Sequence, residues 1–163
     1  MTDIGRASPT DDMGRLLPHA GTARMIERVL RWDSQEILAA TTRHRAADNP
    51  LRLEGRLAAV HLAEFAAQAM AIHGGLLDTA AGREPQPALL VSVRDLELKL
   101  DHIDELAGEL EILARVLLAN AGSWQYSFNV THDGVTIASG RIAAIAQPLD
   151  QAAGSNNMDA SGA

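Results

Sequence analysis

One carboxylate stands inside an otherwise apolar stretch of the chain, and its neighbours can take part in proton transfer. Glu64 lies in the segment GRLAAVHLAEFAAQAMAIHGGLL, with His61 three positions before it and Gln68 four positions after it. Spacings of three and four place side chains on one face of an α-helix. Burial favours the neutral form of a carboxyl group, so an acid in such a helix is suited to donating a proton near neutral pH.

A buried proton donor can assist the departure of a hydroxyl group when water is eliminated. A proton on the neighbouring carbon must also leave, which is easier when amide N–H groups at a helix N-terminus hold the oxygen of an adjacent carbonyl group. The expected helix start, Gly55 to Ala59, could supply these amides. We take Glu64 as the candidate acid/base and His61 as the candidate second catalytic group. The alternatives are structural: a buried acid held by a polar partner, and a polar residue at a helix start.

The remaining polar candidates are weaker. Gln68 is expected to orient Glu64 or to form a hydrogen bond across a dimer. His19 and His44 are minor candidates for catalysis, and three more histidines are expected in loops or on exposed faces: His73, His102 and His132. Apart from His61 with Glu64, no pair of histidines has a carboxylate at the spacing of metal ligands, so we expect no metal site.

Four arginines precede the expected helix. They could contact the phosphate group of a ligand or an acidic protein, because guanidinium groups suit anions. The alternative is an ordinary solvated loop, since acidic residues lie among them. The arginines are Arg43, Arg45, Arg52 and Arg56.

Composition narrows the class of protein. The 163 residues, 47% hydrophobic and 21% charged, are typical of one globular domain. A net charge of −7 argues against nucleic acid as the main partner. The absence of cysteine excludes disulfides and thiolate chemistry and fits a reducing compartment. With no signal-peptide pattern near the start, we expect a cytoplasmic protein, and the acid inside Leu57–Leu77 argues against a membrane span.

The order of the expected elements predicts the fold. Two strands, Arg24–Trp32 and Gln35–Thr42, precede a helix from Leu57 to about Ala80. Alternating patterns then predict strands at 88–100, 109–118, 123–131 and 135–146, the last two joined by a tight turn at Asp133–Gly134. We expect residues 1–12 to be flexible, 13–147 to form the domain and 148–163 to be disordered.

A helix whose surface is apolar on nearly every side must be buried against other parts of the protein on nearly every side. A strongly curved antiparallel sheet wrapped around one long helix achieves this, which is the α+β hot-dog fold. Such a sheet has free edges, and these domains commonly protect them by forming dimers.

Two motifs carry a resemblance to a known family. The segment LLPHAGTARMIERVL, Leu16 to Leu30, resembles the opening of the 3-hydroxyacyl-acyl-carrier-protein dehydratases, with its Leu-Pro-His and its Glu-Arg-Val. The segment HLAEFAAQAM resembles the core of their central helix, where an acid precedes Ala-Gln by three residues. The resemblance extends over Leu16 to Ala146.

One departure places the chain closer to a divergent branch of that family. The well-known dehydratases carry a catalytic histidine in a loop fourteen residues before the helix acid, and here Pro50 occupies that position. Asn49–Pro50 and Gly55–Arg56–Leu57 resemble instead the dehydratase-like branch of aryl polyene pathways. This resemblance implies Asn49, Gly55, Arg56 and Gln68 as substrate-binding residues.

The resemblance implies a 3-hydroxyacyl dehydratase-like lyase of fatty-acid or polyene-type biosynthesis. Its substrate would be carried on the phosphopantetheine of acyl carrier protein or CoA, with no other cofactor. It would form a homodimer, or a heterodimer with another dehydratase-like subunit, which could lend the missing histidine. Two alternatives remain: an acyl thioesterase, and a non-catalytic acyl-binding subunit of a heteromeric dehydratase.

Overall fold

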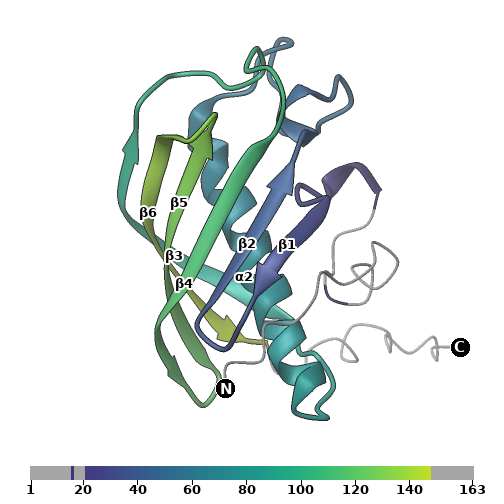
Figure 1. The fold of residues 1–163 in the computed structure, drawn as a ribbon, viewed down its shortest axis with the longest axis vertical. Coiled ribbons are helices and arrows are strands. Elements are labelled where there is room, and N and C mark those ends of the chain that lie inside the picture. The colour runs from purple at the N-terminus through teal and green to yellow at the C-terminus, as the bar shows by residue number, and fades with distance from the viewer. Residues whose placement is uncertain (1–15, 17–20, 148–163) are drawn as a thin grey trace, which may run out of the picture.

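The computed structural model describes Leu16 and residues 21–147. These residues form one long helix and a six-stranded antiparallel sheet (Figure 1). The elements are η2 (Gly21–Ala23), β1 (Arg28–Trp32), β2 (Glu36–Thr41), η3 (Arg43–Arg45), η4 (Ala59–His61), α2 (Leu62–Ala80), β3 (Ala88–Leu98), β4 (Leu110–Asn120), β5 (Ser123–His132) and β6 (Val135–Ala146). The expectations for residues 1–12 and 148–163 concern parts of the chain outside the described residues.

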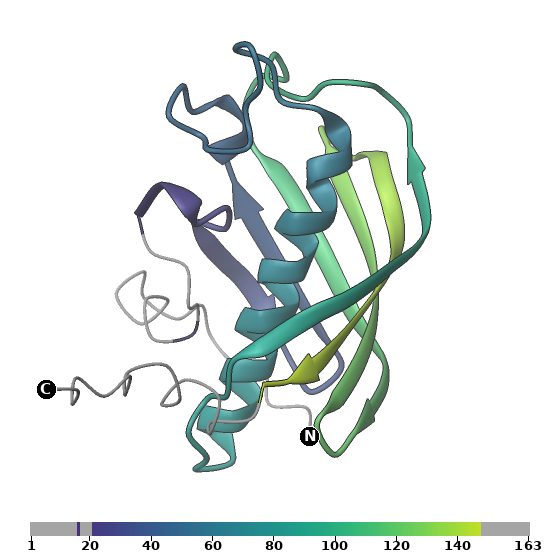
Figure 2. The same ribbon diagram turned by 180° about the vertical axis from the view of Figure 1, so that it is seen from behind.

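The strands follow the order β1-β2-β4-β5-β6-β3 across the sheet. β4, β5 and β6 form the expected antiparallel meander, and β3 returns to pair with the far side of β6. The sheet curves around α2, which runs along its concave face (Figures 1 and 2). This arrangement confirms the hot-dog fold, with β1 and β3 as the two edges.

The turn between β5 and β6 shows how local chemistry determines this meander. Asp133 and Gly134 have φ angles of 50° and 77°, as a two-residue type I′ turn requires. Aspartate and glycine are residues that tolerate this left-handed backbone region. The turn places His132 opposite Val135 and Thr131 opposite Thr136, and an irregularity between Val130 and Thr131 shifts the register of the rest of the hairpin.

The core lies between α2 and the sheet. Phe65, Ala69 and Ile72 of the helix are fully buried, and they belong to the same cluster as Ile112 of β4 and Val130 of β5. Burial of apolar surface stabilises the fold by roughly 25 cal/mol per Å².

No helix in the described part of the chain is long and apolar enough to cross a bilayer.

The helix begins later than the sequence predicted. We expected it to start at Leu57, but α2 starts at Leu62 after the single 3-10 turn η4. The backbone at Leu57 is engaged elsewhere: its N–H donates to Asp104 Oδ1 at 3.0 Å, and its carbonyl accepts from Ile103 N–H at 2.9 Å. These bonds hold the segment in an extended conformation against residues 101–104.

The first strand is also shorter than expected. It begins at Arg28 and not at Arg24. Upstream of it, the Met25 N–H donates to Gln68 Oε1 at 2.7 Å, and the Ala23 carbonyl accepts from Gln68 Nε2 at 2.9 Å. A side chain of α2 thus occupies the N–H of Met25, a residue that we expected to lie in the strand.

Candidate active site

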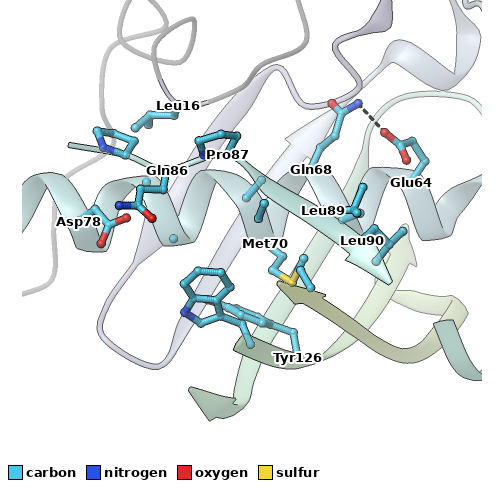
Figure 3. Close-up of a pocket in the computed structure, with 18 residues that line it drawn as sticks. Leu16, Glu64, Gln68, Met70, Asp78, Gln86, Pro87, Leu89, Leu90 and Tyr126 are labelled. Atoms are coloured by element: carbon cyan, nitrogen blue, oxygen red, sulfur yellow. Dashed lines mark hydrogen bonds between the residues drawn. The ribbon is translucent and has the colours of Figure 1, made fainter. Parts of the chain in front are cut away.

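A cavity of about 490 Å³ lies between α2 and the start of β3. Its helical side runs from Glu64 past Gln68 to Asp78, and residues of the 85–90 segment form the opposite side (Figure 3). Trp124 and Tyr126 of β5 line it from the sheet. The volume falls in the range of small-molecule binding sites, and most of the lining is apolar with few polar groups, as is usual for such sites.

Gln68 is a buried polar residue of this site, and hydrogen bonds fix its orientation. Its side chain is 2% exposed, and its amide makes three hydrogen bonds. Oε1 accepts from the Met25 N–H, while Nε2 donates to the Ala23 carbonyl and to Glu64 Oε1. With both N–H bonds in use, the amide orientation is set by its partners and the side chain has little capacity left for a ligand. Gln68 is therefore a positioning residue.

Glu64 lies at the end of the cavity that is nearest to the N-terminus of α2. It belongs to the first turn of α2, where the helix dipole favours negative charge, and its side chain is partly buried. Gln68 Nε2 donates to its Oε1 at 3.1 Å (Figure 3). Glu64 and Gln68 are the two sequence-predicted site residues that the structure brings together on the cavity wall.

Histidines do not line the cavity among the described residues. His61, the proposed second catalytic group, is the N-cap residue of α2 and is partly buried. His44 is fully buried, and its Nε2 lies 2.9 Å from the Leu106 carbonyl. Burial lowers the pKa of His44 below its usual value. His19 falls outside the described residues.

The three predicted substrate-binding residues of the preceding loop are not among the lining residues of the cavity. Asn49 is buried, with Nδ2 donating to the Arg43 carbonyl and Oδ1 accepting from the Leu51 N–H, both at 2.9 Å. Gly55 has a φ of 76°, and Arg56 forms an ion pair with Asp104. The contacts of Asn49 and Arg56 hold the loop together.

The arginines before the helix have similar structural contacts. Arg52 donates to four backbone carbonyls, and Arg43 donates to two carbonyls and pairs with Asp48. Arg45 is exposed. Most of these arginines therefore stabilise the loop, and few of their donors remain available to an anionic partner.

The prediction that Gly55–Ala59 supplies free amide donors requires a correction. The Leu57 N–H donates to Asp104 Oδ1, and the Ala59 N–H donates to the Asp101 carbonyl at 2.8 Å. The Arg56 N–H donates to the Leu53 carbonyl at 3.0 Å. These three amides already donate to acceptors within the chain, so they are not available as donors to a thioester oxygen.

His73 is the polar residue that sequence reasoning misplaced. We expected it in a loop or on an exposed face, but it is fully buried on α2. Its Nε2 lies 2.7 Å from the Asp33 carbonyl, which can only accept, so Nε2 carries the proton. Nδ1 then accepts from the Tyr126 hydroxyl at 2.7 Å. Burial lowers the pKa of His73 and raises the pKa of Tyr126.

A signal for this burial is present in the sequence. His73 follows Ala66 by seven positions and Ala69 by four, and it precedes Leu76 by three. These are the spacings of the buried helix face. The His73–Tyr126 pair supports the side of the cavity that faces the core, because Tyr126 is itself a lining residue.

Comparisons with known proteins agree with this fold. The ApeP-like family, described as ApeP dehydratase, matches residues 12–155. No curated protein sequence matches the chain.

Three solved structures illustrate the structural similarity. The dehydratase heterocomplex ApeI:P from Xenorhabdus doucetiae has a TM-score of 0.78 at 17% identity, covering 86% of this chain and 93% of that one. AziG from S. sahachiroi has a TM-score of 0.53 at 16% identity, with coverages of 74% and 90%. A hypothetical thioesterase with coenzyme A from Streptococcus pneumoniae has a TM-score of 0.51 at 10% identity, with coverages of 69% and 82%.

At these identities the structural matches establish the hot-dog fold, and the family match extends over nearly the whole chain. The resemblance seen in the sequence motifs is thereby confirmed. The chain belongs to the ApeP-like dehydratase family, whose reaction class is that of the hydro-lyases.

Proposed function

We propose that the protein eliminates water from a 3-hydroxyacyl thioester and that Glu64 is the catalytic acid/base. The observation that carries this proposal is the position of Glu64: a carboxyl group at one end of a largely apolar cavity, oriented by the buried amide of Gln68. The substrate would be carried on a phosphopantetheine arm, of acyl carrier protein or of CoA, and no further cofactor takes part.

The reaction needs two proton transfers. A base removes the α-proton. The electron pair of that C–H bond forms the α,β double bond as the bond between the β-carbon and its hydroxyl oxygen breaks, and the acid donates a proton to that oxygen, which yields water and an enoyl thioester. Glu64 can serve one of these steps, and a positioned acid or base of this kind contributes roughly 10²–10⁴-fold to a rate.

A second subunit is proposed to supply the other catalytic group. Among the described residues no histidine lines the cavity, although His61 is three positions from Glu64. A histidine lent by a partner dehydratase-like subunit would complete the pair. One solved structure similar to this chain is a heterocomplex of dehydratases, which supports such an assembly.

The β3 edge of the sheet supports the same assembly. Within the described part of the chain β3 pairs with β6 alone, and two of its apolar side chains are exposed: Leu89 is 53% exposed and Val91 51%. Leu89 and Leu90 also line the cavity. An apolar strand edge invites pairing with another chain. A subunit paired along β3 would therefore lie beside the cavity and within reach of it.

The test is an assay of Glu64→Gln on a 3-hydroxyacyl thioester of acyl carrier protein, with the chain alone and with a partner dehydratase subunit. We expect the enoyl product to fall at least 100-fold, because the amide cannot exchange the proton. Glu111→Gln, an exposed position on β4, is the matched control and should leave turnover unchanged.

Three outcomes would count against the proposal. Unchanged turnover in Glu64→Gln would remove Glu64 from the mechanism. Free thiol without enoyl product would identify a thioesterase. Absence of activity both alone and in the mixture would favour a non-catalytic acyl-binding subunit.

A further inference from the structure

The cavity extends well beyond the Glu64 carboxyl group, along the axis of α2 (Figure 3). Its helical lining ends at Asp78, which lies about 21 Å from Glu64 along the helix at a rise of about 1.5 Å per residue. The reacting carbons and the thioester would occupy only the end nearest Glu64. The remaining length is available for another part of the ligand.

The middle of the cavity is uncharged. It is lined by small side chains from the helix and by larger apolar or aromatic ones from the sheet, among them Ala67, Ala71, Gly74, Leu90, Trp124 and Tyr126. Removing apolar surface from water is favourable by roughly 25 cal/mol per Å². This part of the cavity therefore suits an apolar chain.

Gly74 is the lining residue that requires an explanation. It lies in the interior of α2, where glycine destabilises a helix by roughly 1 kcal/mol relative to alanine. Its φ is not in the left-handed region, so the backbone conformation does not demand glycine. A Cβ built at this position meets no atom within 4 Å in the part of the chain that the structure describes.

The neighbouring glycine provides a contrast. A Cβ at Gly75 would lie 2.7 Å from Leu16 Cδ2, so close packing accounts for glycine there. Neither packing among the described residues nor backbone geometry accounts for glycine at position 74. Among the described residues, what Gly74 preserves is open space on the cavity wall.

We propose that Gly74 determines which acyl groups bind: it keeps the cavity open for a long, unbranched apolar chain that lies along α2. The chain starts beside Glu64 and passes over Gly74 towards Asp78. A side chain at position 74 would obstruct this path partway and would leave the end near Glu64 free. The inference rests on the proposed function, since it takes the acyl thioester as the ligand.

The experiment measures binding rather than turnover. Saturated acyl groups from butanoyl to hexadecanoyl, attached to pantetheine through an unreactive amide, are titrated calorimetrically into the full chain. The variants are Gly74→Ala, which tests folding and helix stability, and Gly74→Leu, which fills the cavity. The matched control is Ala80→Leu, which adds the same side chain at an exposed end of the same helix.

We expect Gly74→Leu to weaken binding of the longest chains at least tenfold and to change binding of butanoyl less than twofold. Ala80→Leu should bind the whole series as the unchanged chain does. Gly74→Ala should melt at a higher temperature, because it removes the glycine penalty.

Two other results would overturn the inference by itself: the same chain-length preference in Gly74→Leu, or an equal loss at every length. An altered oligomeric state of Gly74→Leu would also overturn it, since the open space would then belong to a subunit contact. If the unchanged chain binds no member of the series, the proposed function fails and the inference fails with it.

Discussion

At the scale of single residues, the site depends on one amide. Gln68 uses both donors and an acceptor to connect the backbone of Ala23 and Met25 with the carboxyl group of Glu64. The position of the acid is therefore determined by a segment outside the helix that carries it. A buried amide of this kind strongly prefers one orientation, because any other would leave several buried groups unpaired.

His73 gives a prediction for pH dependence. Burial lowers the pKa of His73 and of His44 in the folded protein, whereas an unfolded histidine titrates near pH 6.5. Between the lowered values and about 6.5 the unfolded state binds more protons, so the free energy of unfolding falls as pH decreases through this window. We expect urea midpoints to decline between pH 7 and pH 5.

The variant His73→Gln identifies the source of this decline. It removes one of the two titrating groups, so its stability should be lower at pH 7 but should fall less between pH 7 and pH 5. An unaltered slope would exclude His73 as a cause. The carboxyl groups with lowered pKa values, among them Asp33 and Asp104, lose their contribution only below about pH 4.5, and so do not interfere.

At the scale of elements, the start of α2 decides which groups reach the cavity. Because residues 57–59 pair with residues 101–104, the helix begins at Leu62 and Glu64 lies in its first turn. Had the helix begun at Leu57, Glu64 would lie about two turns inside it, away from the positive end of its dipole. The loop after β3 thus contributes to the environment of the acid.

Asp104 is the residue that holds this arrangement. Its carboxylate accepts from the Leu57 N–H at 3.0 Å and from Arg56 Nε at 2.9 Å, and the hydrogen bond from Leu57 lowers the pKa of Asp104. Asp104→Ala should reduce the free energy of unfolding by about 1–3 kcal/mol, because it leaves a partly buried amide without an acceptor. Chemical denaturation is the measurement.

A control separates this backbone contact from the ion pair. Arg56→Gln removes the charge but keeps the Asp104–Leu57 bond. The Arg56 side chain is half-exposed, and ion pairs near the surface contribute only about 0–1 kcal/mol. The account of the helix start would be wrong if Arg56→Gln destabilised the protein more than Asp104→Ala.

At the scale of the whole molecule, the two edges of the sheet differ. β1 is short and ends in the ion pair between Arg31 and Glu36, which discourages further pairing. β3 is longer, it exposes the apolar side chains of Leu89, Val91 and Val93 in its first half, and it borders the cavity. The asymmetry favours β3 as the edge along which the proposed second subunit would pair.

Assembly along β3 can be tested with one charge. Lysine on an edge strand opposes pairing, so Val91→Lys should weaken association with a second subunit at least tenfold, as measured by analytical ultracentrifugation. Val135→Lys, at an exposed valine beside the turn of the β5–β6 hairpin, is the matched control and should associate normally. Equal association of both variants would place the subunit contact elsewhere.

The elements of the fold could be predicted because their signals are local. The alternation in β5, the Asp133–Gly134 turn and the end of α2 before Gly82 each depend on a few neighbouring residues, and the structure agrees with all three. Periodicity also predicted that Glu64 and Gln68 share a helix face, and a hydrogen bond joins them. The sequence by itself therefore determined the order of elements and the central pair of the candidate site.

Only the tertiary structure decided the contacts between distant parts of the chain. Gln68 meets Met25 across 43 positions, Asp104 meets Leu57 across 47, and His73 meets Tyr126 across 53. These bonds determine where the helix starts, which amides are occupied and which histidine is buried. A local pattern carries no information about them, because a polar group takes whichever partner the folded sheet brings within hydrogen-bond distance.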